Sequence, residues 1–192
     1  MSLPKFNPRT LVLLLMILVI GIVRVIFIAD DKFSSVNNFS PLGAMALFGG
    51  AYFNKNWKAL GFPILTLFLS DVFLSLTVYS ELSNGILYGG WYWVYGAFVL
   101  MTMAGRLLIK KITPVSILVA TIVSVCIHWL VSDIGVWYGS AIYAQTLSGY
   151  IACLVAAIPF ELRFLTGTLV YGAILFGAFE WMQQKYSALK TA

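Results

Sequence analysis

Residues 10–29 read TLVLLLMILVIGIVRVIFIA, an apolar run whose single charge is Arg24. A run of about 20 apolar residues is the length that crosses a bilayer as a helix. Lys5 and Arg9 precede it, as basic residues precede a secretory signal. The run is too long for a signal-peptide core, however, and no small-residue cleavage site follows it. We therefore expect a retained membrane-spanning helix.

The rest of the chain has the same apolar character. Hydrophobic residues make up 61% of the 192 residues and charged residues 10%, and the mean hydropathy is +0.93. There is room for about six helices of ~20 residues and for no separate soluble domain, ATPase or large catalytic module. The sequence therefore predicts an all-α integral membrane protein with one transmembrane domain over 1–192. The expected six spans are 10–29, 41–53, 57–79, 91–109, 114–133 and 164–182.

The basic residues fall in alternate breaks between the apolar runs. Nine of the 12 lysines and arginines do so: Lys5, Arg9, Lys55, Lys58, Arg106, Lys110, Lys111, Lys185 and Lys190. The breaks between these hold Asp30, Asp31, Lys32, Glu81 and Asp133. Because basic loops stay cytoplasmic, we expect both termini in the cytoplasm, an even number of spans and a bacterial inner-membrane location. The net charge of +5 follows the loops, so it does not indicate nucleic-acid binding.

The region before the last run is ambiguous. Residues 146–158 are apolar but too few for a span, and Pro159 follows them. A seventh crossing there would place Lys185 and Lys190 outside, against the charge rule. We therefore expect 134–158 to be an outer loop that carries a short re-entrant or interfacial helix. Irregular backbone at membrane depth must be covered by protein or line a cavity, which hints at a binding site on the outer side.

Polar side chains also lie inside the predicted spans. Asp71 is an ionisable residue within the third span, where charge is costly and function is the default hypothesis. Two stripes at i, i+4, i+8 spacing each share one helix face. These stripes are Asp71, Ser75 and Tyr79, and Ser124, His128 and Ser132. Burial without partners is expensive, so we expect Asp71 to face the protein interior.

Tryptophans and tyrosines gather at the same predicted depth. The hypothesis is a substrate pocket floored by polar residues and walled by aromatic ones. Its residues would be Asp71, Ser75, Trp91, Trp93, His128, Trp137 and Tyr138. The alternatives are an interfacial aromatic belt and a packed, hydrogen-bonded His128. The alternative for Asp71 is a structural role, as a cap or in a pair with Arg24 or Arg163. Glu161 and Arg163 can satisfy each other or backbone groups freed by Pro159.

Enzyme motifs are absent from the sequence. It contains no Walker loop, HExxH, GxSxG or Cys/His metal spacing, so we expect no catalytic activity and no intrinsic cofactor or metal. Cys126 and Cys153 lie inside apolar runs and are expected to be small core residues.

Four segments carry a resemblance to a known family: NFSPLGAMALFGGAYF at 38–53, LSDVF at 69–73, DIGVW at 133–137 and AIPF at 157–160. With them the chain resembles a bacterial family of uncharacterised membrane proteins that are described only as candidate transport proteins. More distantly it resembles the S components of energy-coupling factor (ECF) vitamin transporters. That resemblance implies a six-helix protein that captures a vitamin from outside and works with a coupling subunit and two ATPases. Some cobalamin-binding members act without dedicated partners.

The chain departs from the S-component pattern in two places. The small-residue docking face expected in the first span is found instead in the second, at Ala46 and Gly50, where tight internal packing is the alternative. The loop after the third span has no cysteine to ligate the cobalt of a cobalamin. His128 is the remaining imidazole that can ligate cobalt if the substrate is a corrinoid.

Two hypotheses of function follow. In the first, the protein sits in the lipid bilayer and binds a small molecule for uptake; a vitamin is the expected class, and cobalamin or a corrinoid the best single guess. In the second, it is a structural or assembly protein whose aromatic belt and small residues serve only helix packing. A tightly bound compound in the purified protein distinguishes the first from the second.

Overall fold

The computed structural model describes residues 7–29, 38–80 and 86–190, and this part of the chain folds into helices with no strand. The helices are α1 (Pro8–Ala29), α2 (Leu42–Tyr52), α3 (Asn56–Leu76), α4 (Trp91–Leu108), α5 (Pro114–Trp137) and α6 (Leu147–Lys185), followed by a short 3-10 turn, η2 (Ser187–Leu189). The prediction of an all-helical fold is thereby confirmed. Lys5, Asp30, Asp31, Lys32 and Glu81 lie outside the described residues.

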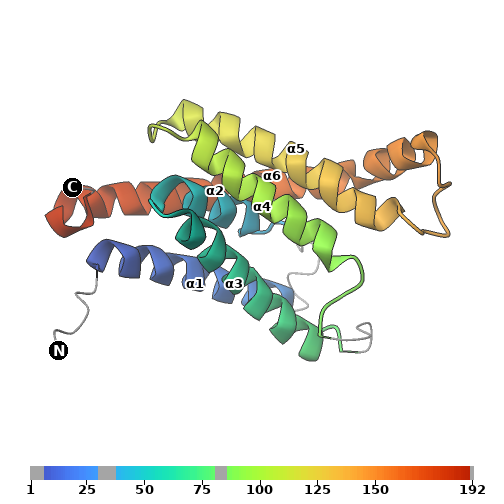
Figure 1. The fold of residues 1–192 in the computed structure, drawn as a ribbon, viewed down its shortest axis with the longest axis horizontal. Coiled ribbons are helices and arrows are strands. Elements are labelled where there is room, and N and C mark those ends of the chain that lie inside the picture. The colour runs from blue at the N-terminus through green and yellow to red at the C-terminus, as the bar shows by residue number, and fades with distance from the viewer. Residues whose placement is uncertain (1–6, 30–37, 81–85, 191–192) are drawn as a thin grey trace.

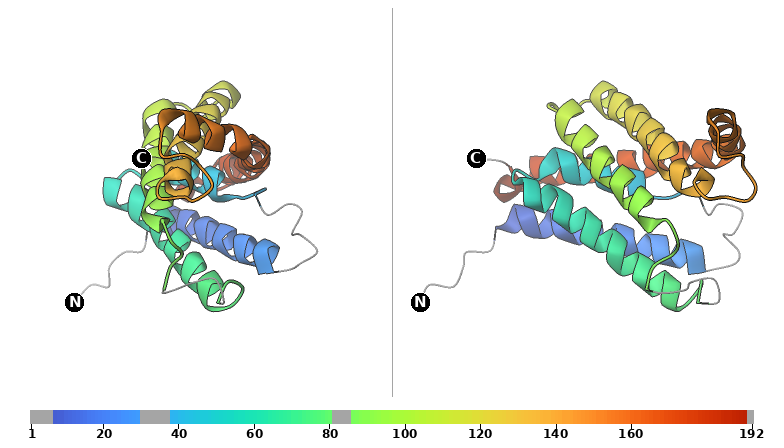
Figure 2. Two further views of the ribbon diagram at one scale, coloured as in Figure 1. Left: turned by 90° about the vertical axis from the view of Figure 1, so that its right-hand side faces the viewer. Right: turned by 45° about the vertical axis from the view of Figure 1, so that its right-hand side comes forward.

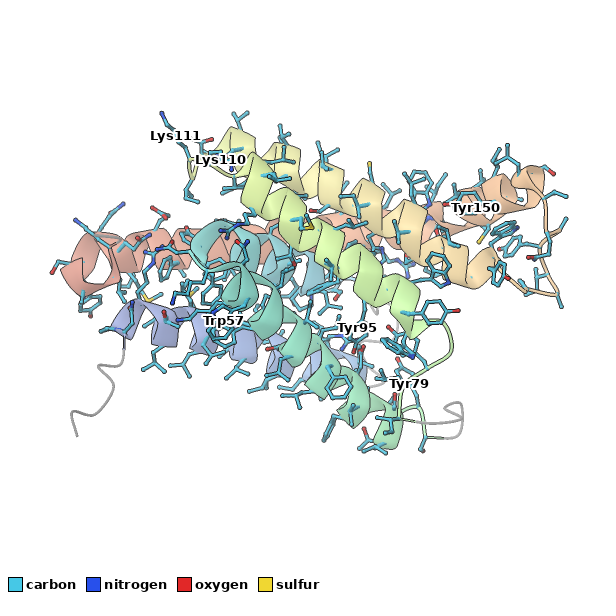
Figure 3. All side chains as sticks on the ribbon, in the orientation of Figure 1. Trp57, Tyr79, Tyr95, Lys110, Lys111 and Tyr150 are labelled. Carbon is cyan, nitrogen blue, oxygen red and sulfur yellow. The ribbon has the colours of Figure 1, made fainter. Side chains whose placement is uncertain are left out.

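The helices run along one long bundle, and α1 begins at the end where α6 finishes (Figure 1). The turns at 53–55 and 109–113 lie at that same end. We call it the basic end, and Figure 3 shows Lys110 and Lys111 there. Its basic residues are Arg9, Lys55, Lys58, Arg106, Lys110, Lys111, Lys185 and Lys190. Residues 86–90, which precede α4, and the segment that joins α5 to α6 lie at the opposite end.

Four helices, α1, α3, α5 and α6, are long and apolar enough to cross a membrane. The protein is therefore a membrane protein by the length and composition of its helices. The expected six spans are supported only in part. The polar aromatic start of α4, Trp91 to Tyr95, lowers its hydropathy, and the 11 residues of α2 rise only roughly 16 Å, about half of a hydrocarbon core.

The short helix α2 is the centre of the bundle. Every residue from Gly43 to Gly50 is buried, and α2 packs against all five other helices. Glycines let the neighbours approach: a Cβ on Gly50 would collide with the carbonyl oxygen of Thr102, and one on Gly105 would lie 2.8 Å from that of Leu47. Because lipid gives little hydrophobic drive for association, close backbone contact of this kind holds membrane helices together.

The predicted docking face on α2 is wrong, because its residues are inside the protein. Ala46 is 0% exposed and Gly50 is buried against α4. The small residues at this spacing serve internal packing, which was the alternative interpretation. The apolar pattern of α2 has no polar side, as expected for a helix that is surrounded by protein.

Arginines from two helices bind the carboxyl end of α2. Arg9 donates to the carbonyl of Tyr52 at 3.5 Å, and Arg106 donates to the carbonyls of Phe53 at 2.8 Å and Asn54 at 2.9 Å. These carbonyls have no partner within the helix, and they carry the negative pole of its dipole. Part of the basic end therefore has a structural function in addition to the cytoplasmic location that its charge predicts.

The loop expected over 134–158 is confined to 138–146, and the prediction of a short separate helix within it is wrong. Helix α5 continues to Trp137, and α6 begins at Leu147 and runs 39 residues through Pro159 without a break. Proline removes one backbone hydrogen bond but can be accommodated in a membrane helix as a bend. Figure 2 shows the first turns of α6 at an angle to the rest. At roughly 58 Å, α6 exceeds the thickness of a hydrocarbon core, so residues 147–158 extend the last helix rather than forming a separate one.

Candidate functional site

A buried ion pair joins α1 to α3. Arg24 Nη2 lies 2.6 Å from Asp71 Oδ1, and the two side chains are 12% and 1% exposed. The other guanidinium nitrogen, Nη1, donates to the hydroxyl of Ser70. Tyr95 of α4 donates its hydroxyl to Asp71 Oδ2 at 3.0 Å. The expectation that Asp71 faces the protein interior is confirmed, and of the two arginines considered as its partner, the structure selects Arg24.

A second cluster joins α5 to the bend of α6. His128 Nδ1 lies 2.9 Å from Glu161 Oε1, and its ring stacks on Phe164 with the centroids 4.3 Å apart. Glu161 thus pairs with His128, while Arg163 is exposed, so the expected Glu161–Arg163 pairing is wrong. The prolyl residue at 159 begins the turn that carries Glu161, and this places a carboxylate of α6 against α5.

Asp133 lies close to this cluster on α5. It directly follows Ser132, the last residue of the Ser124–His128–Ser132 face, and is 8% exposed. Its Oδ2 atom and Glu161 Oε2 are buried without a hydrogen-bond partner in the described structure. A buried polar atom without a partner costs about 1–3 kcal/mol, and these two are the carboxylate oxygens among the buried unpartnered atoms of the described residues.

The two clusters border two adjoining pockets, which we call the two lobes of the polar cavity. The α1 lobe, of about 210 Å³, is lined by Arg24, Ser40 and Tyr79 among others. The α5 lobe, of about 310 Å³, is lined by Ser132, Asp133 and Tyr143 among others. Both lobes share four residues: Asn38, His128, Phe160 and Glu161. The helix directions place this cavity in the half of the bundle away from the basic end (Figure 1).

The amino end of α2 also borders the polar cavity. Leu42, its first residue, lines the α1 lobe, and the backbone N–H of Leu42 donates to the hydroxyl of Ser40 at 3.3 Å. Gly167 of α6 lies against the backbone of Ser40, where an added Cβ would come within 2.8 Å of its nitrogen. The chain can therefore enter the bundle at this depth and begin a helix beside the cavity.

The predicted aromatic wall is wrong, because Trp91, Trp93, Trp137 and Tyr138 are not among the residues that line either lobe. Trp91 and Tyr138 are 41% and 68% exposed, as in an interfacial belt. Trp93 packs against Gly135 at the contact of α4 with α5. Trp137 donates its indole N–H to the carbonyl of Ala144 at 2.8 Å and thereby orders the segment before α6.

Of the three residues predicted to floor the pocket, only His128 lines the cavity directly. His128 lines both lobes, whereas Asp71 reaches the cavity only through its ion pair with Arg24. Ser75 is buried on the same face of α3 as Asp71 and lines neither lobe.

Tyr88 lies just outside the spans, before α4. Burial raises the pKa of Tyr88, and the charge of Asp71 raises it further, so this hydroxyl stays neutral.

Sequence reasoning missed most of the cavity-lining polar residues. Arg24, Glu161 and Asp133 were noted as partners or loop residues rather than as parts of a site, and Asn38 only within a motif. Their common signal is a charged or amide residue within or beside an apolar run. That signal identifies the residues one by one, but which of them meet depends on how the helices are rotated.

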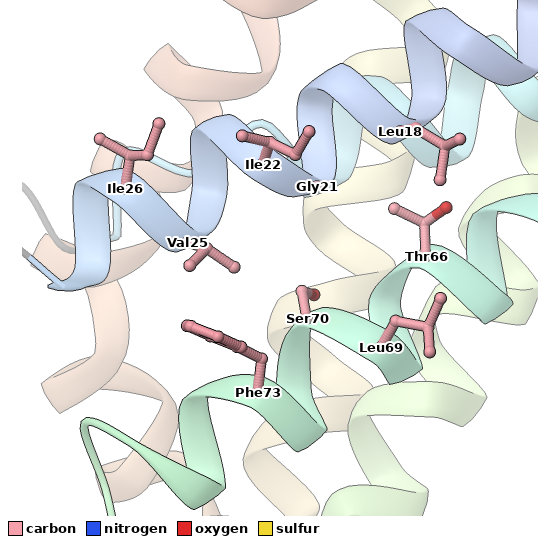
Figure 4. Close-up of a pocket in the computed structure, with 9 residues that line it drawn as sticks. All are labelled: Leu18, Gly21, Ile22, Val25, Ile26, Thr66, Leu69, Ser70 and Phe73. Carbon is pink, nitrogen blue, oxygen red and sulfur yellow. The ribbon is translucent and has the colours of Figure 1, made fainter.

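A separate apolar groove runs between α1 and α3 (Figure 4). It has a volume of about 350 Å³ and is lined by residues such as Leu18, Ile22 and Phe73, all of them exposed. Its few polar groups are those of Thr66 and Ser70, and Ser70 already donates to the carbonyl of Leu67 at 2.8 Å. A groove of this chemistry faces hydrocarbon and offers no group that would recognise a polar solute.

A metal centre is not assembled within the described ranges. No group of three or more His, Cys, Asp and Glu side chains there could hold a metal ion. His128 uses Nδ1 for Glu161, so Nε2 is the ring nitrogen left for a ligand such as cobalt. Cys126 is exposed and Cys153 is buried beside the backbone of Asp133.

Comparison with known proteins gives a family but no function. Residues 4–189 match a family described as a family of unknown function (DUF6580), and the chain belongs to that family. No curated protein and no solved structure matches the chain at a significant level.

Proposed function

We propose that this member of the DUF6580 family is a membrane-embedded binding protein that captures a small polar solute and takes part in its uptake. The observation that carries the proposal is the polar cavity, where side chains of α1, α5 and α6 place charged groups at membrane depth. Ionisable residues inside membrane bundles are costly and commonly mark substrate or ion pathways. A purely structural protein gains nothing from two buried carboxylate oxygens that lack partners.

The location of the cavity supports capture from outside. It lies in the half of the bundle away from the basic end, and basic segments remain cytoplasmic. We propose accordingly that the basic end faces the cytoplasm of a bacterial inner membrane and that solute enters from the other side. The sequence resemblance to S components adds a mode of action, in which the protein delivers its solute together with a coupling subunit and ATPases.

The size of the cavity constrains the solute. The lobes, of about 210 Å³ and 310 Å³, lie below and at the lower end of the roughly 300–1,000 Å³ that is typical of drug-sized ligand pockets. These volumes favour a compact solute over a corrinoid, which is much larger than a drug-sized ligand. The cavity accordingly favours a compact vitamin or another small solute over cobalamin.

The experiment that tests the function is detection of a bound compound. The protein is purified from its own host in mild detergent, and native mass spectrometry measures the mass of the intact protein with any adduct. Ala157 lines the α5 lobe, so Ala157→Phe fills the site, whereas Ala178→Phe places the same side chain at an exposed position of the same helix. We expect an adduct on the wild type and on Ala178→Phe, and its loss from Ala157→Phe.

Two outcomes contradict the proposal. If the wild type carries no small-molecule adduct, the structural or assembly role becomes the better account. If the adduct survives in Ala157→Phe, the compound binds elsewhere and the polar cavity is not its site.

A further inference from the structure

The charges around the polar cavity do not balance. Arg24 is paired with Asp71, and His128 with Glu161. Asp133 has no basic group within 4.0 Å among the described residues. The other arginine nearby in sequence, Arg163, is exposed on α6. The α5 lobe therefore holds at least one carboxylate, that of Asp133, without a basic partner.

Two carboxylates of the same lobe each have an unsatisfied oxygen. Asp133 is 8% and Glu161 9% exposed, and both line the α5 lobe. Oδ2 of the first and Oε2 of the second are buried atoms without a hydrogen-bond partner. A carboxylate only accepts hydrogen bonds, so what satisfies these atoms must donate them. A solute that brings only acceptors, such as a carboxylate or phosphate, would worsen both the charge and the hydrogen bonding.

The remaining walls of the α5 lobe suit an organic cation. Phe160 and Tyr143 contribute aromatic rings, and ring faces attract ammonium groups. Asn38 adds an amide that can accept or donate a hydrogen bond. An ammonium group has three N–H donors, enough for both carboxylates and one further acceptor.

We infer that the solute carries an ammonium group, which binds in the α5 lobe between Asp133 and Glu161. This inference rests on the proposed function, because it names the chemical class of the solute that occupies the same cavity. The alternative donor is a proton held by one of the two carboxylates, and the experiments below separate it from a cation.

The first test places an ammonium in the lobe by mutation and needs no knowledge of the solute. Ala157 lies one helical turn before Glu161, on the same face of α6, and lines the α5 lobe. Ala157→Lys supplies a tethered ammonium, and Ala157→Met supplies a neutral chain of similar length. We expect the lysine variant to unfold at a Tm higher by roughly 2–4 °C than the methionine variant, since this is the shift typical of 1 kcal/mol in a protein of this size.

The difference in Tm between the lysine and methionine variants must depend on the two carboxylates. In an Asp133→Asn/Glu161→Gln background the advantage of lysine over methionine should disappear. A lysine variant no more stable than the methionine variant overturns the inference, as does an advantage that persists without the carboxylates.

The second test uses the native adduct. Asp133→Asn removes the charge and keeps the shape, and Glu180→Gln is the matched control, because Glu180 is a carboxylate of α6 that accepts from Tyr52 at 2.6 Å outside the cavity. We expect at least a tenfold loss of adduct in Asp133→Asn, none in Glu180→Gln, and an adduct whose fragmentation shows an amine. An adduct unchanged in Asp133→Asn, or one without a basic nitrogen, overturns the inference and leaves the proposed function standing. If the wild type carries no adduct, both the inference and the proposed function are contradicted.

Discussion

At the scale of single residues, this protein places charged side chains in helices that are otherwise apolar, and it pairs them across the bundle. Arg24 and Asp71 are the clearest case, with 12% and 1% of their side chains exposed. Tyr95 and Ser70 complete the hydrogen bonding around the pair. Removing one partner from such a pair is far more costly than removing both, because a single buried charge remains.

The first prediction concerns Arg24→Met. It should lower the free energy of unfolding by about 3–5 kcal/mol, because Asp71 is left buried without a countercharge. The double variant Arg24→Met/Asp71→Asn should recover a clear part of this loss. Unfolding in mixed detergent micelles measures both values. Equal losses in the single and the double variant would show that the charge pair is not what holds α1 to α3.

At the scale of elements, α2 has the greatest influence on the bundle. It is too short to cross a membrane, yet it contacts every other helix and is buried from Gly43 to Gly50. Its amino end opens onto the polar cavity and its carboxyl end is bound by Arg9 and Arg106. Both ends of a short helix thus find partners in the protein, as membrane depth requires.

The second prediction concerns glycine contacts. Gly50→Ala should destabilise the protein by about 1–3 kcal/mol, because the new methyl group meets backbone atoms of Thr102 and Arg106 that cannot give way. The matched control is Gly61→Ala in α3, where no atom lies within 4 Å of the added Cβ and helix propensity should improve stability by about 0.5–1 kcal/mol. Thermal unfolding of the two variants compares them directly. A Gly50→Ala variant that is at least as stable as the wild type would contradict the close packing of α2 on α4.

At the scale of the whole molecule, the two ends of the bundle differ in chemistry. The basic end gathers lysines and arginines from the start of α1, the turns at 53–55 and 109–113, and the end of α6. The opposite half holds the polar cavity, whose lining includes the carboxylates of Asp133 and Glu161. By the tendency of basic segments to stay cytoplasmic, this polarity predicts that the cavity faces away from the cytoplasm.

The third prediction is the membrane orientation. In a Cys126→Ala/Cys153→Ala background, a membrane-impermeant maleimide added to intact cells should label Ala144→Cys, in the segment between α5 and α6. Lys110→Cys, in the turn at the basic end, should react only after the membrane is permeabilised. Labelling of Lys110→Cys but not Ala144→Cys in intact cells would show that the protein has the opposite orientation.

The amino-acid sequence by itself determined the class of protein and most of its helices. Helix bounds within the described residues follow the apolar runs closely: α2 spans 42–52 where 41–53 was expected, and α4 spans 91–108 where 91–109 was expected. Such features are local. Hydrophobic length and helical periodicity depend only on neighbours along the chain, and so does the alternation of basic segments.

Only the tertiary structure decided which polar residues meet. Arg24 donates a hydrogen bond to Ser70, 46 positions away, and His128 contacts Glu161, 33 positions away. Such pairs depend on the rotation of each helix about its axis and on its tilt, and a shift of one residue turns a side chain by about 100°. For the same reason the tryptophans expected around the site lie elsewhere, Ala46 and Gly50 are inside, and α6 continues through Pro159, because neighbouring helices rather than local sequence set these positions.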